Sequence, residues 1–459
     1  MCEWLEVISR VNMSVLVRFA PSPTGFLHVG NIRIALVNWL FAKAIGGSFL
    51  LRIDDTDTKR SELRYVEQIK EDLSWLGLVW DDIKFQSKRM DRYDECKDFL
   101  IKSRRLYPCY ETKEELEVRK KLLLKSKKPP IYDRAALRLA ENEVKKLEQE
   151  GRRPHWRFFI DHSEKIVLKD EIKGDVIFDP SKISDPILIR EDGSMTYIFA
   201  SVIDDIDFNI THIIRGEDHL SGSAIHANLF KALGAAQMPN FAHIPLMRSK
   251  YGEISKRYGS IFGIKSLRES GISAKAIINL LAKLGTCDEV NYSYGVKDLI
   301  SQFSFKKFSQ SCVLYDEDEL TKLNEKVMHN MPYKEALILM KDFDFDISEE
   351  IWEAAKSNIS NIRDILLWKR ICQEKLMPKI LDIEYTMGVS EILPEEPWDS
   401  NTWQELLSKT KKLFNKKGKE LFLPIRLALT GVDDGPELQK LLPLIGRKRC
   451  YERLRGNES

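Results

Sequence analysis

The sequence has 459 residues, of which 43% are hydrophobic and 31% are charged, a composition that excludes wholesale disorder and a fibrous repeat. At about 150 residues per domain, this length predicts about three domains. Lys and Arg together number 72 and Asp and Glu 70, so the formal net charge of +2 does not by itself favour a nucleic-acid partner.

The charge is unevenly distributed along the chain. After residue 400 there are 13 Lys and Arg against 7 Asp and Glu, whereas the first 400 residues carry 59 against 63. Because charge asymmetry can mark a surface that binds a polyanion, the C-terminal part is the first candidate for such a surface.

Cysteine usage and the N-terminal residues indicate a cytoplasmic protein. The seven cysteines are scattered without a CxxC pair, which is typical of a reducing compartment and argues against a disulfide framework. The first thirteen residues fit neither a signal peptide nor a transit peptide. The apolar stretch 34–51 contains Asn38, Lys43 and a Gly-Gly breaker, so we predict helix, turn and strand there and no membrane span.

The first half of the chain alternates strand and helix patterns. We predict a parallel sheet with helices on both faces from a strand at 15–20, a helix at 31–45, a strand at 49–53 and a helix at 61–76. From about residue 92 to 201 the pattern becomes irregular, and we interpret this part as an inserted domain. Its predicted elements are helices at 113–125 and 135–150 and β-like runs at 156–160 and 187–190.

The αβ pattern resumes over 210–264. After Ser266 the sequence predicts almost only helices, with strong 3.6-residue periodicity at 274–284 and 362–371.

The segment 18–31 (RFAPSPTGFLHVGN) carries the most informative motif. A buried strand ends in a turn stiffened by Pro and Gly, and a helix then begins near His28, Gly30 and Asn31. Backbone N–H groups and the helix dipole at such a start favour an anion, so we predict a phosphate site there. The alternative is an ordinary turn in which Asn31 caps the helix and His28 lies on the surface.

This motif resembles the HIGH motif of class I aminoacyl-tRNA synthetases, in the form that bacterial glutamyl-tRNA synthetases carry. The resemblance continues in order through residues 52–57 (RIDDTD), 215–219 (RGEDH), 254–257 (ISKR) and 423–431 (LPIRLALTG). It implies an α/β fold, with a Rossmann-like class I catalytic domain, an inserted α+β acceptor-binding domain and an all-α anticodon-binding region. The implied boundaries are 1–92 and 206–264 for the catalytic halves, 93–205 for the insert, 265–320 for a stem-contact domain and 321–459 for anticodon binding.

The resemblance also implies the reaction. ATP and L-glutamate form glutamyl-adenylate, and the 3′ end of tRNA then takes the glutamate; in this family, tRNA usually has to bind before the adenylate forms. Two alternatives stay open. One is a truncated relative that glutamylates a modified tRNA base, against which the helical, basic C-terminal part argues. The other is a non-catalytic RNA-binding paralogue.

The amino-acid substrate is predicted to be anionic. Arg18 and Arg215 both end strands at the carboxyl edge of the sheet, where two guanidinium groups suit a dicarboxylate. By resemblance, the glutamate pocket consists of Arg18, Ala20, Ser22, Tyr197, Ser201 and Arg215, with Asp54 at the α-amino group. Asp54 and Ser201 stand where the family more often has Glu and Asn. The alternative for Arg18 is a surface ion pair with Asp54 or Asp55.

The resemblance assigns ATP to a second group of residues and implies Mg²⁺ as its companion. Lys256 follows a glycine-bearing loop and is predicted to clamp the triphosphate, although a solvated basic loop is the alternative and Glu253 replaces a usual lysine. His28, Gly30 and Lys256 are the predicted catalytic residues. The full predicted ATP set is His28, Gly30, Asn31, Asp218, Met247, Ser255, Lys256 and Arg257, with adenine against the backbone of Leu246 and Met247.

No structural zinc is predicted. Some bacterial relatives carry a Cys-rich segment in the insert, but residues 107–111 offer one cysteine and residues 132–134 none, whereas a tetrahedral zinc site needs three or four N or S ligands.

The tRNA partner would meet the basic C-terminal part. Six lysines cluster at 409–419 beside Phe414, and residues 447–449 (RKR) follow, although a solvated helix face is the alternative. Whether tRNA-Glu, tRNA-Gln or both are charged stays open, and a monomer is expected from the family.

Overall fold

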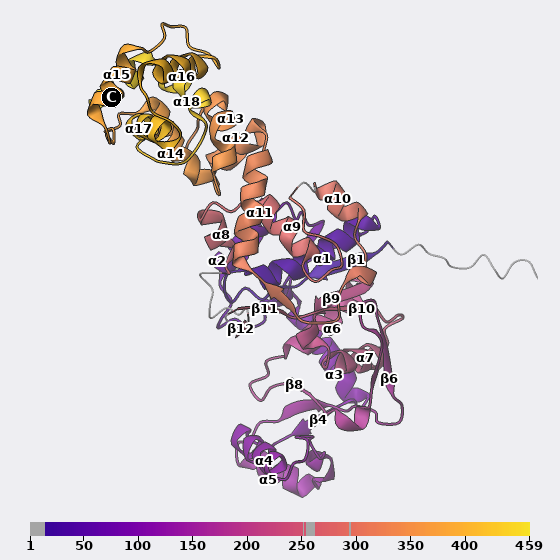
Figure 1. Cartoon of the computed structure of the whole chain (residues 1–459). Helices are drawn as coiled ribbons and strands as arrows, with labels where there is room; N and C mark the ends of the chain where they lie inside the picture. Colours follow the sequence, from indigo (N-terminus) through magenta and orange to yellow (C-terminus); the bar gives the residue numbers. More distant parts are fainter. Residues whose placement is uncertain (1–13, 251, 254–261, 293–294) are drawn as a thin grey trace, which may run out of the picture. The chain divides into compact units, whose positions relative to one another are not determined.

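A computed structural model describes residues 14–250, 252–253, 262–292 and 295–459 (Figure 1). The described chain forms two compact units. The first takes the chain up to Ser266 together with Leu281–Val290 and the segment that ends at Tyr315. The second takes Leu267–Leu280 and Asp316–Ser459.

The centre of the first unit is parallel sheet, as the αβ alternation predicts. One sheet consists of β1 (Leu16–Phe19), β2 (Ser48–Ile53) and β3 (Asp82–Phe85), all parallel. In a second sheet, three parallel strands are flanked by one antiparallel strand, in the order β7 (Gly174–Phe178), β6 (Ile166–Asp170), β10 (Asn240–Ile244) and β9 (His212–Gly216). The amide of Thr211 donates to the carbonyl of Leu16 at 2.9 Å, so β1 and β9 adjoin where both strands begin.

The first unit also contains longer helices, several of which pack against these sheets. The helix α1 packs against β1, β2 and β9, while α3, α6 and α7 share a continuous apolar core with Leu50, Ile213 and Phe241 of the strands. Burial of this core is the main favourable term for folding. The helices are α1 (Val29–Ala44), α2 (Leu63–Trp75), α3 (Met90–Lys102), α6 (Tyr197–Asp207) and α7 (Ser223–Ala232).

The segment between α3 and α6 adds a small antiparallel sheet and two helices. The strands are β4 (Leu106–Cys109), β5 (His155–Phe158) and β8 (Ile187–Ile189), and the helices are α4 (Lys113–Lys125) and α5 (Glu141–Gln149).

The predicted single helix at 135–150 is wrong. Residues Ala135–Arg138 form only a 3₁₀ turn, and Leu139 is extended with φ −66° and ψ 132°. The carboxylate of Glu143 accepts the amide of Ala140 at 2.8 Å, so a new helix begins at Glu141.

Short strands and helices follow β10 in the described part of the chain. After Ser266 the sequence predicts almost only helices, and the described residues include one strand there, β13 (Val313–Tyr315), which pairs parallel with β11 (Met247–Ser249). The remaining elements are β12 (Gly252–Glu253), α8 (Ile264–Glu269), α9 (Ala274–Lys283) and α10 (Val296–Ser301).

The second unit is helical, as predicted, and its later helices form the orange and yellow bundle in Figure 1. Side chains of Asp316, Ser348 and Asp382 accept backbone amides where helices begin, while Trp352 and Trp368 lie in its core. Its helices are α11 (Glu317–Asn330), α12 (Tyr333–Lys341), α13 (Glu349–Ala355), α14 (Ile365–Gln373), α15 (Ile383–Glu391), α16 (Thr402–Leu413), α17 (Lys419–Thr430), α18 (Leu438–Ile445) and α19 (Arg447–Leu454).

In the part of the chain that the structure describes, no helix has the length and apolarity to cross a membrane.

Candidate active site

The start of α1 is organised by His28. This residue is the N-cap, and its Nδ1 accepts from the amides of Gly30 at 3.1 Å and Asn31 at 3.4 Å. Asn31 completes a capping box, because its Oδ1 accepts the amide of His28 at 3.2 Å. The proton of the neutral imidazole is therefore on Nε2, where it can be donated to a phosphate oxygen. The alternative in which Asn31 is the cap does not hold.

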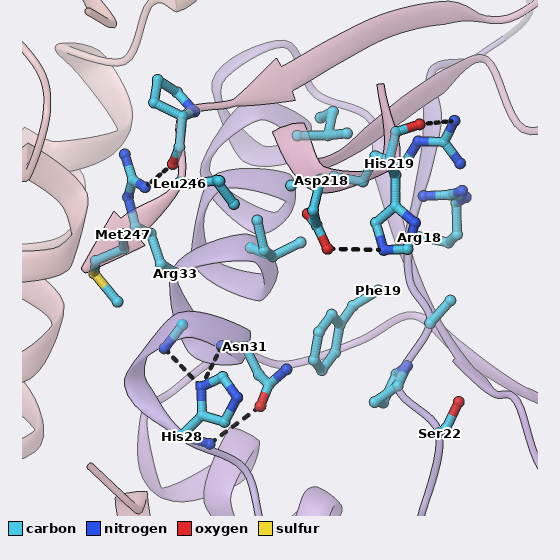
Figure 2. Close-up of a pocket in the computed structure, with 18 of the residues that line it drawn as sticks. Arg18, Phe19, Ser22, His28, Asn31, Arg33, Asp218, His219, Leu246 and Met247 are labelled. Carbon is cyan, nitrogen blue, oxygen red and sulfur yellow. Dashed lines mark hydrogen bonds and ion pairs between the residues drawn. The ribbon is translucent and has the colours of Figure 1, made fainter. Parts of the chain in front are cut away.

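A cavity of about 380 Å³ opens beside this helix start (Figure 2). It lies at the carboxyl ends of β1 and β9, which is where parallel α/β sheets bind ligands. Its lining includes ten of the predicted site residues: Arg18, Ala20, Ser22, His28, Gly30, Asn31, Tyr197, Arg215, Asp218 and Met247.

Five predicted site residues do not belong to this lining as described. Ser255, Lys256 and Arg257 lie outside the described residues. Asp54 and Ser201 are buried and do not line the cavity, and both contact Arg52. The guanidinium of Arg52 donates to both carboxylate oxygens of Asp54 at 2.7 and 3.1 Å and to Oγ of Ser201 at 2.9 Å. Burial raises the pKa of Asp54 to about 6. The predicted contact of Asp54 with an α-amino group stays a prediction.

Arg18 is held by a carboxylate that the sequence did not reveal. Its guanidinium donates to both oxygens of Asp205 on α6, at 3.0 and 3.1 Å, and Arg18 is 3% exposed. Asp205 also accepts from Arg52 at 2.8 Å. The alternative for Arg18, a surface pair with Asp54 or Asp55, is therefore wrong. One signal was present in the sequence, because Asp204 and Asp205 interrupt an apolar helix, and buried charges need partners.

Arg215 brings positive charge to the cavity without a carboxylate partner among the described residues. Its guanidinium contacts Ser223 at 2.6 Å and the rings of His226 and His243, both at 3.3 Å. Burial lowers the pKa of Arg215 to about 10, so the group is still a cation at neutral pH. A buried cation surrounded by neutral groups favours an anionic ligand.

Asp218, His219, Leu246 and Met247 also line the cavity. Figure 2 shows Asp218 and His219 facing each other, with 3.5 Å between Oδ2 and Nε2. Leu246 and Met247 follow β10 on the far side of the cavity (Figure 2). The sequence argument missed Arg33, which lines the cavity and donates to the carbonyl of Pro245 at 2.7 Å, thereby fixing the turn before β11 against α1.

A possible metal cluster was also missed, because it joins two strands. Cys109 on β4 is paired with His155 on β5, and with Glu111 they offer three ligand atoms that lie within 4.8 Å of one another. The set fits zinc poorly. Burial raises the pKa of the Cys109 thiol to about 12, which disfavours the thiolate that zinc binds. Glu111 already accepts a hydrogen bond from Tyr132 at 2.6 Å, and the positive charge of Arg157 lies 4.2 Å from the ring centre of Tyr132. The absence of zinc stays a prediction.

The basic residues of the second unit differ in their surroundings. Lys409 pairs with Glu405 at 2.8 Å and Lys416 with Asp382 at 2.6 Å, and Phe414 packs edge-on against Tyr385 at 5.0 Å between ring centres. Lys411 and Lys412 are exposed, and no ion pair is recorded for them within the described residues. Arg449 is structural, because it donates to the carbonyls of the last turn of α14.

Comparison with known proteins identifies the family of this chain. The family described as tRNA synthetases class I (E and Q), catalytic domain, matches residues 14–322, and the family described as anticodon binding domain matches residues 388–457. Glutamate–tRNA ligase 2 of Orientia tsutsugamushi (strain Boryong) is 45% identical over 446 residues, covering 96% of this chain and 99% of the relative. The chain belongs to the glutamate–tRNA ligase family of class I tRNA synthetases.

Other relatives support the same family over nearly the whole chain. The synthetase is 45% identical over 447 residues to glutamate–tRNA ligase of Azospirillum brasilense, covering 97% of this chain and 99% of the relative. It also matches the crystal structure of a glutamate tRNA ligase from Elizabethkingia meningosepticum in complex with its amino acid. That match has a TM-score of 0.83 and 28% identity, and covers 96% and 98% of the two chains. The predicted fold class, a class I catalytic domain followed by a helical anticodon-binding region, is confirmed, and the synthetase uses ATP.

Proposed function

We propose that this protein attaches L-glutamate to the 3′ end of tRNA. The α-carboxylate of glutamate attacks the α-phosphate of ATP, forming glutamyl-adenylate and releasing diphosphate. The terminal ribose hydroxyl of tRNA then attacks the activated carbonyl and releases AMP. One observation carries the substrate class: Arg18 and Arg215 line the same cavity as the capped start of α1. One end of that cavity therefore suits a dicarboxylate and the other a phosphate.

The residues divide into two groups. For glutamate we propose contacts from Arg18, Ala20, Ser22, Tyr197 and Arg215, with Asp54 and Ser201 supporting the pocket through Arg52. For ATP we propose His28, Gly30, Asn31, Asp218 and Met247, joined by Ser255, Lys256 and Arg257 from outside the described residues. No side-chain nucleophile is needed, because positioning and stabilisation of charge on the departing diphosphate supply the catalysis.

Mg²⁺ is proposed to enter with ATP as part of the substrate. Of the described residues that line the cavity, Asp218 alone carries a carboxylate, which is too few for a protein-built magnesium site and fits an ion held by phosphates and water. The synthetase would work as a monomer in the cytoplasm, a prediction that rests on the cysteine usage and the family resemblance.

Charging assays with transcripts of tRNA-Glu and tRNA-Gln test this function. We expect glutamate on the 3′ end of one or both, and a large loss of kcat in Lys256→Ala. Diphosphate exchange should be much faster with tRNA present than without it. Glutamate found on an anticodon base would instead support the truncated relative, and tRNA binding without any charging would support the non-catalytic paralogue. The match of residues 388–457 to the anticodon-binding family argues against the former.

A further inference from the structure

Buried hydrogen bonds connect Arg215 through His243 to Asp170 at the end of β6. Its Nε donates to Nε2 of His243 at 3.3 Å, and Nδ1 of His243 lies 2.6 Å from Oδ2 of Asp170. Side chains of His243 and Asp170 are 0% and 1% exposed. Asp170 ends β6, which comes from the segment between β4 and α6 and pairs with β10 next to His243.

Asp170 is fixed as an acceptor. Its Oδ1 accepts the amides of Ile172 at 2.9 Å and Lys173 at 2.8 Å, while its Oδ2 accepts the amide of His243 at 3.0 Å in addition to the ring. Burial opposes ionisation, but these hydrogen bonds outweigh it and lower the pKa of Asp170. An ionised carboxylate can only accept hydrogen bonds, so the proton between the two side chains belongs to Nδ1 of His243.

The position of this proton determines whether Nε2 of His243 can accept a hydrogen bond from Arg215. Burial lowers the pKa of His243, so the ring is neutral and carries one proton. With that proton on Nδ1, Nε2 presents a lone pair to Arg215 and to Oγ of Ser223, which lies 2.8 Å away. With the proton on Nε2, two N–H groups would face each other in a buried site, and the hydrogen bond would be lost at a cost.

We propose that Asp170 is a positioning residue of the amino-acid pocket, which holds His243 in the Nδ1–H tautomer and thereby directs the guanidinium of Arg215 into the cavity. Asp170 contacts no substrate. Asp205 has the corresponding role for Arg18, because it accepts hydrogen bonds from the guanidinium of Arg18 directly. The inference rests on the proposed function, because it assumes that Arg215 binds glutamate.

Asp170→Asn tests the tautomer. The backbone amides of Ile172 and Lys173 can only donate, whereas the ring of His243 can move its proton, so the amide oxygen keeps the place of Oδ1 and the NH₂ group faces His243. This orientation gives up the hydrogen bond from the amide of His243 and favours the Nε2–H form. Because Arg215 loses a hydrogen bond to a charged group, KM for glutamate should rise at least about tenfold. KM for ATP should change less than about twofold, since the start of α1 is untouched. Asp175→Asn, at an exposed position on the neighbouring strand β7, is the matched control and should change neither constant.

A measurement on the unmodified protein covers the case in which Asp170→Asn does not fold. With ¹⁵N-labelled histidine, the ring nitrogens of His243 should show a protonated Nδ1 and an unprotonated Nε2. A protonated Nε2 in the wild type would overturn the proposal, and so would an Asp170→Asn protein in which both KM values rise in the same ratio.

Arg215→Lys separates this proposal from the function on which it rests. If Arg215→Lys raises KM for glutamate but Asp170→Asn does not, the positioning role fails and the pocket stands. If neither variant changes KM for glutamate, the proposed pocket itself is wrong.

Discussion

At Gly30, the space for a side chain is already taken. A Cβ built there would lie 2.9 Å from both Cε1 and Nδ1 of His28, so Gly30→Ala should push the imidazole out of its cap. Alanine gains about 1 kcal/mol over glycine in a helix, which offsets a lost cap of about the same size. Stability should therefore change little while KM for ATP rises about tenfold. Diphosphate exchange and thermal unfolding measure the two effects, and an unchanged KM for ATP would refute the role given to this helix start.

His155 should make the protein less stable in acid. Burial, followed by the charge of Arg157, lowers the pKa of His155 to about 4, whereas the unfolded chain has a value of about 6.5. As pH falls below about 6.5 the unfolded state takes up the proton first, so the free energy of unfolding decreases until about pH 4, by up to about 3 kcal/mol. This loss should be smaller in His155→Gln.

Urea unfolding at pH 7 and pH 4.5 measures that difference. His162→Gln, at an exposed histidine, is the control and should keep the wild-type pH dependence. A His155→Gln protein that loses as much stability in acid as the wild type would show that this histidine is not the cause.

The contacts of the site could be predicted from the sequence only where the contacting residues are close together in the chain. His28, Gly30 and Asn31 act on one another within three residues, so the motif alone predicts the helix start. The partner of Arg18 is 187 positions away, and a single sequence does not show which of many carboxylates will meet it. The same holds for Asp170 and His243, whose pairing depends on β6 joining β10.

At the level of elements, apolar patterning was reliable and helix continuity was not. The strands β1 and β2 and the helix α1 follow from continuous apolar residues and from end signals in the adjacent sequence. The charged helix α4 buries no residue, and the capping box of Thr112 and Glu115 marks its start. The break at Leu139 has no proline or glycine to mark it. The amide of Ala140 donates to the carboxylate of Glu143, so a new helix begins there and the chain does not continue as one long helix. The periodicity of apolar residues does not predict such a hydrogen bond.

The helix α15 offers an element-scale prediction, because it depends on a glycine for its packing. A Cβ at Gly388 would lie 2.5 Å from Cζ of Phe414, whose ring also packs against Tyr385. Gly388→Ala should therefore lower the free energy of unfolding by about 1–3 kcal/mol, although alanine ordinarily favours a helix by about 1 kcal/mol.

Thermal unfolding of Gly388→Ala, of Phe414→Leu and of the double variant measures the coupling. Since a smaller side chain at position 414 makes room for the methyl group, the double variant should lose less than the sum of the two single losses. Additive losses, or a Gly388→Ala protein more stable than the wild type, would contradict this packing.

Across the whole molecule, the net charge of +2 hides two different surfaces. The first unit contains the substrate cavity, in which Arg18 pairs with the buried Asp205 whereas Arg215 has no carboxylate partner among the described residues. The segment after residue 400, which lies in the second unit, carries 13 Lys and Arg against 7 Asp and Glu. Part of that excess is already engaged, since Arg449 and Arg453 donate to backbone carbonyls and Lys409 pairs with Glu405. The charge count therefore overstates what is available to RNA.

Lys411 and Lys412 on α16 are the residues we expect to meet tRNA phosphates. A lysine that contacts a phosphate releases a counterion, so its loss weakens binding and lowers the slope of log affinity against log salt by about 1. Filter binding of tRNA from low to moderate salt should show a slope reduced by about 2 in Lys411→Ala/Lys412→Ala. Lys409→Ala on the same helix should change the slope less, because Glu405 already neutralises that charge. If the double variant keeps the wild-type slope, this face of α16 does not contact RNA, and the lysine run is only a solvated helix surface.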